Sequence, residues 1–319
     1  MNNESHENLN FTTTLDEALQ NSQKEWFEFS ELFPHELVGL YGDRLYAGDI
    51  YIPSGVTCIG RNALRECHHV RNIIMPDSVE NIGDYAFANC WSLVKINIPT
   101  RVTKIGSNAF YGCSDLESIV LPAEIEELED CIFEGCQSLA EINIPQKVSV
   151  IGSGSFRNCE KLTHITLPKE VKNIGASAFE GCKSLTSITI PSGITSIEES
   201  TFSGCTSLEN IIIPSSVTDI GSEAFRNCKC LINVIISENV ETINDFAFDE
   251  CLSLKIIMIP NSVVNIERYA FCNCNNLTNI VFQGTKAQWE AIEKGIAWDE
   301  GADSYTVYCI DGNIPKQNA

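Results

Sequence analysis

Cysteine is the residue whose number and spacing most invite a chemical role in this chain. The 319 residues include 15 cysteines, an odd number, so at least one thiol is free or paired with another molecule. Ten of them recur at a constant interval of 23 residues, namely Cys67, Cys90, Cys113, Cys136, Cys159, Cys182, Cys205, Cys228, Cys251 and Cys274. Thiols at regular spacing could form disulfides, ligate a metal or pack as small apolar groups.

Packing is the predicted role of this cysteine column. If the units stack in register, neighbouring cysteines lie about 4.8 Å apart, which is within the Cα range of a disulfide. Their Cβ vectors would run parallel along the stack, however, and this favours a ridge of buried thiols. No C-x-x-C pair occurs, whereas structural zinc needs four converging ligands. An occasional disulfide or a metal site stays as the alternative.

Histidines and carboxylates offer little for catalysis. The histidines are His6, His35, His68, His69 and His164. Only His164 falls at a strand position that should face the open side of a sheet, and no nucleophile accompanies it in a triad pattern. The acidic run from Glu124 to Glu134 lacks the spacing of a calcium loop. It predicts a solvated face, with a docking patch for a basic partner as the alternative. We expect no catalytic residue, no cofactor and no metal.

Composition and charge restrict the class of protein. Hydrophobic residues make up 44% and charged residues 20%, which is typical of a folded, water-soluble chain. The net charge of −22 argues against binding to nucleic acid. No stretch of 18 apolar residues predicts membrane insertion. The start MNNESHENLNFTTT lacks a secretory signal, so with Met1 as the natural start we expect no export by the general pathway.

A repeat of 23 residues organises the elements that carry these residues. One unit has the form C-x-x-L-x-x-I-x-I-P-x-x-V-x-x-I-G-x-x-A-F-x-x, and it recurs with no insertion between Cys67 and Cys274. A single unit of this size cannot bury its apolar face alone, so the columns must stack as interior ridges. The proline column from Pro53 and the phenylalanine column from Phe87 to Phe271 are two such ridges.

Each unit predicts one short strand and a return. The alternation at Ile96 and Ile98 predicts a strand that Pro99 ends. The Val-x-x-Ile segment then crosses the coil, and the Ala-Phe-x-x-Cys segment is expected to form a short helical turn. Gly106 marks a turn, but other residues fill its column, so we expect no positive φ there. Stacking predicts a parallel sheet of about eleven strands over residues 50–282.

Both ends of the chain depart from the repeat, as solenoid caps do. Residues 1–49 are predicted as a helical cap and a degenerate first coil. The helix would start at the capping box Thr14-x-x-Glu17 and carry Leu15, Ala18, Leu19, Trp26, Phe29 and Phe33. Residues 283–319 are predicted as a C-terminal cap. It would contain a helix that begins at Thr285-x-x-Gln288, followed by a strand from Ser304 to Ile310.

The repeat unit resembles the BspA-like leucine-rich repeat, a 23-residue class of the leucine-rich repeat superfamily. The resemblance covers roughly residues 50–282, and the ending GTKAQWEAI…W…YTVYCIDG is similar to the family's terminal segment. It implies a right-handed superhelix and a protein-interaction or adhesion role, often in a secreted or cell-surface protein. It implies no catalytic residue. Pro and Val replace the asparagine region of the better-known repeat, so no asparagine ladder is expected.

Outward-facing strand positions are the predicted binding residues. In the middle units these positions are polar, as at Asn97, Asn143, Thr166 and Thr189. Later units place apolar residues there: Ile212, Ile232, Ile235, Ile256, Met258 and Val281. A contiguous exposed apolar patch usually marks an interface. The alternatives are that the C-terminal cap covers the patch, or that β-branched residues merely favour strands.

These features predict a non-catalytic protein-protein interaction or adhesion module that presents the outward face of its sheet. A self-associating structural surface protein, including a homodimer, is the alternative. A carbohydrate-active module is more remote because aromatic residues are nearly absent from the outward positions. Partner identity, cellular compartment and oligomeric state stay open.

Overall fold

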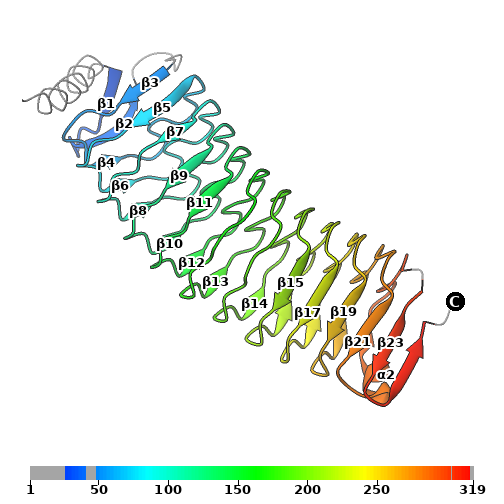
Figure 1. The fold of residues 1–319 in the computed structure, drawn as a ribbon. Coiled ribbons are helices and arrows are strands. Elements are labelled where there is room, and N and C mark those ends of the chain that lie inside the picture. The colour runs from blue at the N-terminus through cyan, green and yellow to red at the C-terminus, as the bar shows by residue number, and fades with distance from the viewer. Residues whose placement is uncertain (1–25, 41–47, 303, 317–319) are drawn as a thin grey trace, which may run out of the picture.

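The computed structural model is an elongated solenoid of stacked coils (Figure 1). It describes residues 26–40, 48–302 and 304–316. Almost all regular elements are short parallel strands that pair with the equivalent strand one coil along. The predicted parallel repeat solenoid is therefore confirmed, whereas the division into segments 1–49, 50–282 and 283–319 stays a prediction.

The main ladder is built from the Ile-x-Ile positions of the repeat. Most strand pairs have an offset of 23 residues, as in Ile73 with Ile96 and Ile211 with Val234. The strands are β3 (Gly48–Tyr51), β5 (Val70–Ile74), β7 (Lys95–Ile96), β9 (Ser118–Val120), β11 (Glu141–Asn143), β15 (Asn210–Ile213), β17 (Asn233–Ile236), β19 (Ile256–Ile259), β21 (Asn279–Phe282) and β23 (Thr306–Cys309). The two coils between β11 and β15 have no named strand in this ladder, and a single parallel bridge joins them, between His164 and Ser187.

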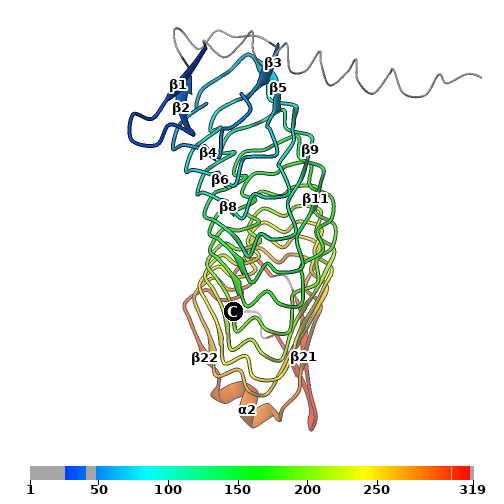
Figure 2. The same ribbon diagram turned by 90° about the vertical axis from the view of Figure 1, so that its left-hand side faces the viewer.

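A second parallel ladder runs along the opposite side of the coils, where the repeat pattern predicted only a return of the chain (Figure 2). The isoleucine that ends each Val-x-x-Ile segment, or Leu128 in its place, is buried, and the residue before it is half-buried or exposed. The strands are β2 (Glu36–Leu40), β4 (Cys58–Ile59), β6 (Asn81–Ile82), β8 (Lys104–Ile105), β10 (Glu127–Leu128), β12 (Val150–Ile151), β13 (Asn173–Ile174), β14 (Ser196–Ile197), β16 (Asp219–Ile220), β18 (Thr242–Ile243), β20 (Asn265–Ile266) and β22 (Glu293–Lys294).

The Ala-Phe-x-x-Cys segment is a run of tight turns, so the expected helical turn is wrong. The Tyr111 and Cys113 amides donate to carbonyls three residues back, while the Phe110 amide donates to Ile132 in the next coil. Bonds to the next coil use amides that a helix would need. Left-handed φ angles at Asn108 and Gly112 also interrupt helical geometry.

These left-handed positions form two columns that recur in nearly every coil. The first column starts at Asn62 and the second lies directly before each repeat cysteine. Gly106 lies in neither column, as expected. A glycine is needed there for a different reason, the close approach of the neighbouring coil. A Cβ atom at Gly106 would lie 2.5 Å from the Asp84 amide nitrogen, so the backbones of neighbouring coils approach closely there.

The core consists of stacked identical side chains. Phenylalanine rings from Phe87 to Phe271 stack with centroids 5.2 to 5.7 Å apart, and all nine are fully buried. The column thiols lie beside them. The Cys182 Sγ, for example, donates to the Phe156 carbonyl at 3.1 Å. The predicted interior ridges are thus confirmed.

The described part of the N-terminal region is a strand and not a helix. β1 (Phe27–Phe29) pairs antiparallel with β2, and Phe27 is buried. The helical expectation was wrong here. Phe27 and Phe29 alternate along a strand, and this strand covers the first edge of the second ladder. The predicted capping box at Thr14 and Glu17, with Leu15, Ala18 and Leu19, lies outside the described residues.

The C-terminal region follows its prediction closely. Helix α2 (Lys286–Ala291) begins with a capping box between Thr285 and Gln288. β23 then joins the main ladder in parallel, and β24 (Gly312–Pro315) pairs with it antiparallel. The Lys316 amide donates to the Tyr305 carbonyl. Since the backbone groups of successive residues in an antiparallel strand point to alternate sides, the backbone nitrogen of Pro315 faces the outer edge. Proline lacks an N–H, so this edge is a poor template for another strand.

Candidate functional site

The outward face of the main ladder carries two rows of side chains. The polar row contains Asn210, Asn233, Ile256 and Asn279, and the apolar row contains Ile212, Ile235, Met258 and Val281. Each row advances by one coil per residue, because the strands pair in parallel register. Side chains within one row are therefore direct neighbours.

The apolar row lies exposed on the sheet. Ile212 has 61% of its surface accessible and Ile235 has 40%, while Met258 and Val281 are half-buried. The Gln283 amide approaches the Met258 Sδ at 3.2 Å and shields part of it. In the polar row Ile256 is exposed, at 39%. Five of the six predicted residues therefore lie in these two rows.

Ile232 lies outside both rows. It precedes Asn233, the first residue of β17, and its side chain is half-buried. Its amide donates to the Glu209 carbonyl in the preceding coil. Ile232 therefore borders the polar row where the chain enters the strand.

Among its described residues the C-terminal cap extends the apolar row, and it covers the row only where Gln283 shields part of Met258. Tyr308 of β23 stands in register with Val281 and is 41% exposed. The outward alternation of the YTVYC segment would have identified Tyr308 from the sequence. This tyrosine is the one aromatic residue in the row between Ile212 and the end of β23.

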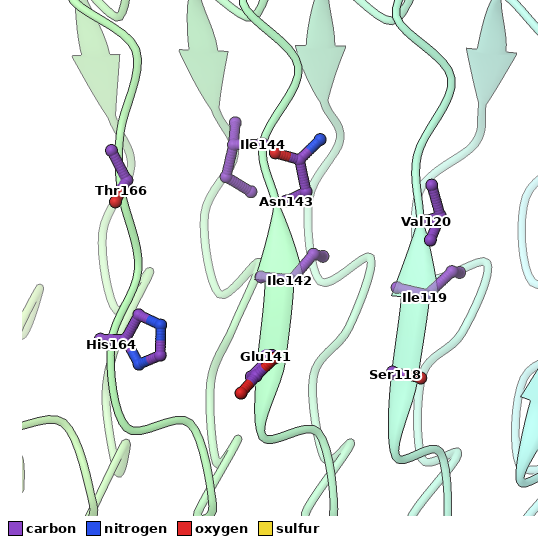
Figure 3. Close-up of a pocket in the computed structure, with 9 residues that line it drawn as sticks. All are labelled: Ser118, Ile119, Val120, Glu141, Ile142, Asn143, Ile144, His164 and Thr166. Carbon is purple, nitrogen blue, oxygen red and sulfur yellow. The ribbon is translucent and has the colours of Figure 1, made fainter.

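A hollow of about 330 Å³ opens farther toward the N-terminus on the same face (Figure 3). β9 and β11 form one side of the hollow, and the coil through His164 and Thr166 forms the other. Figure 3 shows the His164 ring extending from its coil segment toward Glu141. The strand position of His164 predicted that it faces the open side of the sheet, but no residue pattern indicated the hollow.

The cysteine column has no ligand geometry. All fifteen cysteines are free thiols, and burial raises the pKa of Cys113 and Cys182 to about 12. These thiols are therefore protonated at neutral pH, whereas metal ligation needs thiolate. Within the described residues no group of three or more His, Cys, Asp or Glu could hold a metal ion.

The acidic run lies along the second ladder. Glu124, Glu126, Glu127 and Glu129 line a shallow hollow there with Lys104. Lys147 pairs with Glu124, and the Lys104 Nζ lies 3.5 Å from Glu129. These partial pairings agree with the predicted solvated face.

Comparison with protein families matches residues 45–163 and 150–278 to the BspA type leucine rich repeat region, a model of six copies. The two matches together span well over half of the chain. The chain belongs to the BspA-type leucine-rich repeat family. The resemblance inferred from the repeat unit is thereby confirmed.

Solved structures similar to this BspA-type repeat protein come from bacteria. A leucine-rich repeat protein from Bacteroides ovatus is 26% identical with a TM-score of 0.57, over 86% of this chain and 90% of that one. One from Eubacterium ventriosum is 24% identical with a TM-score of 0.54, over 80% and 82%. The pneumococcal vaccine antigen PcpA is 17% identical with a TM-score of 0.50, over 86% and 83%. The search of curated proteins gave no match.

The BspA-type repeat places its recurring residues inside and its variable residues outside. Leucine, isoleucine, phenylalanine and cysteine columns are buried, so they specify the coil. The two outward rows differ from coil to coil and are free to define a surface. The part of the chain that the structure describes also holds no helix with the length and hydropathy of a bilayer span.

Proposed function

We propose that this BspA-type repeat protein is a non-catalytic protein-binding or adhesion module. The exposed apolar row, continued by Tyr308, is the observation that carries the proposal. Four apolar side chains stand in consecutive coils without an intervening polar residue in that row. Contiguous apolar surface of this kind is typical of protein interfaces. A secreted or cell-surface location belongs to the same proposal and is supported by family resemblance.

The absence of charged residues also supports a protein-binding role for this surface. The two rows hold ten residues from β15 to β23, and none of them is charged. The same rows include Lys95 and Glu141 nearer the N-terminus, and the whole chain has a net charge of −22. Charged residues are depleted at the centre of protein interfaces because their burial removes hydration.

An outward substitution tests this proposal. Replacing Ile235 by Glu places a charge in the middle of the apolar row, so we expect capture of the partner from the native organism to be lost. The melting temperature should stay close to that of the wild type because Ile235 is 40% exposed. Affinity capture and thermal melts of both proteins measure these two effects.

Val264→Glu is the matched control. Val264 is 53% exposed and lies beside the second ladder, so this variant adds the same charge on another side of the solenoid. It should keep the partner. Capture by Ile235→Glu at the wild-type level, or equal loss in both variants, contradicts the proposal.

Self-association is the second candidate, because an uncharged surface lets two strongly acidic copies approach with less repulsion. A homodimer would place Met258 in its interface. Sedimentation of the wild type and of Ile235→Glu distinguishes the two candidates. A wild-type dimer that dissociates in the variant favours self-association, and a wild-type monomer removes this candidate.

A further inference from the structure

The main ladder is interrupted between β7 and β9, between β11 and the His164 segment, and before β15, and the hollow lies at the second of these breaks. β11 pairs in parallel with β9, with Glu141 beside Ser118. The next coil pairs only in the other direction, through the bridge from His164 to Ser187. Among the described residues, no strand pairing joins β11 to the segment around His164 and Thr166.

The break leaves backbone groups of neighbouring coils unjoined. In a regular coil the Asn97 amide donates to the Ile73 carbonyl, as parallel register requires. The corresponding bond from Thr166 to Ile142 is missing from the described coils, as is the bond from Thr189 to Ile165 in the next coil. So is the bond from the Thr163 amide to the Ala140 carbonyl, although the Ala140 amide donates to Glu117 and the Thr186 amide to Thr163. Each missing bond leaves one carbonyl acceptor and one amide donor, so the Ile142 carbonyl and the Thr166 amide both border the hollow.

The side chains at the hollow are also rich in acceptors. Glu141, Asn143, His164 and Thr166 line it, and its lining contains no lysine or arginine. Within the described residues Glu141 has no ion-pair partner. The Thr163 hydroxyl lies 3.1 Å from the His164 Nδ1 and holds the ring in place. Ile119 and Ile142 form an apolar floor.

We infer that this hollow is a specificity pocket that receives an arginine side chain of a partner protein. A guanidinium supplies five donors and no acceptor, and its planar fork binds a carboxylate with two parallel bonds. It also stacks on aromatic rings such as the imidazole of His164. About 330 Å³ lies at the low end of small-molecule sites and fits one side chain. The acidic chain would attract such a partner over a distance.

This inference rests on the proposed function, because it names the chemistry of a protein partner that docks on the same face. The two sites are nevertheless separate in the chain. The apolar row begins at Ile212, whereas the pocket ends at Thr166. Capture experiments with Ile235→Glu therefore test the apolar row, and peptide titrations test the pocket.

The test uses isotope-labelled full-length protein and a short capped Gly-Ser-Arg-Ser-Gly peptide at physiological ionic strength. A second peptide replaces arginine by citrulline, which keeps the shape of the side chain and removes its charge. We expect saturable amide shifts at residues 118–120, 141–144 and 164–166 with the arginine peptide alone. Glu141→Gln should weaken its binding about tenfold or more.

Glu209→Gln is the control variant, because it removes an equal charge from an exposed position before β15. It should change the affinity by about twofold at most. The inference is overturned if citrulline binds equally well, if Glu141→Gln binds as the wild type does, if shifts spread to the acidic run, or if no shift saturates. Should it fail while Ile235→Glu still loses its partner, the proposed function stands.

Discussion

The ring of Phe179 illustrates how much one core residue contributes to the stability of the fold. Phe179 is fully buried between Phe156 and Phe202, and both ring centroids lie 5.5 Å away. No other part of the coil can move into its place, because the backbones of adjacent coils are joined on both sides by hydrogen bonds. Removal of the ring would therefore leave a cavity.

Phe179→Ala should lower the free energy of unfolding by roughly 3–5 kcal/mol. Urea denaturation followed by circular dichroism measures this loss. Phe33→Ala provides the control, since Phe33 is 64% exposed and its truncation should change stability by less than about 0.5 kcal/mol. Similar losses in both variants would show that the ring column is not the core.

Buried residues were predictable from the sequence, but backbone conformation was not. The columns of Cys, Phe and Leu repeat at one interval, so stacking alone places them inside. Asn and Gly fill most of the left-handed column before the repeat cysteines, as at Asn89 and Gly112, but the other column includes Tyr85, Cys131 and Phe246, where side-chain type gives no indication. Contacts between neighbouring coils enforce these angles, and a single repeat unit does not contain that information.

At the scale of elements, the thiol column links folding to pH. Burial raises the pKa of nine column thiols, from Cys90 to Cys274, and that of Cys228 to about 12. Unfolded thiols return to about 8.5. Above that pH the unfolded chain loses protons before the folded chain does, so stability is complete below about pH 8.5 and falls as the pH rises toward 12.

The melting temperature should therefore drop steeply between about pH 8.5 and pH 11, with each thiol contributing up to about 1.4 kcal/mol per pH unit. Thermal melts across this range measure the drop. Ultraviolet absorbance of thiolate from the nine column cysteines should appear only together with unfolding. Six of the fifteen cysteines lie outside this set and Cys230 is exposed, so a thiolate signal larger than that of six thiols before unfolding would contradict the burial of the column.

Elements differ in how well sequence alone predicts them. The Ile-x-Ile alternation predicted the main ladder, and the capping box at Thr285 predicted α2. The second ladder has only two paired residues in most coils, such as Lys104–Ile105, and is too short for alternation to mark. The break beside Glu141 also left no trace, because the units around it keep the consensus residues.

The whole molecule behaves as a stack in which each coil contacts its neighbours. Its strands pair with equivalent strands one coil along, and the rings and thiols follow the same order. Stability in such arrays is approximately a sum over coils and their interfaces. Cooperative folding should therefore depend on the register between neighbouring coils more than on the number of coils.

Deletion of residues 91–113 should give a folded, shorter solenoid. The deletion removes 23 residues and joins Cys90 to Ser114, so every column keeps its phase. We expect circular dichroism per residue like that of the wild type and one cooperative melt at a lower temperature. Deletion of residues 91–102 shifts the phase and should abolish cooperative unfolding. Equal behaviour of the two deletions would refute the register argument.

Pro315 has a consequence for assembly. β24 ends the main ladder, and its outward-facing proline offers no N–H to an incoming strand. Addition of another strand at the outer edge of β24 is thus disfavoured. An extended partner would therefore bind the broad face of the sheet and not this edge.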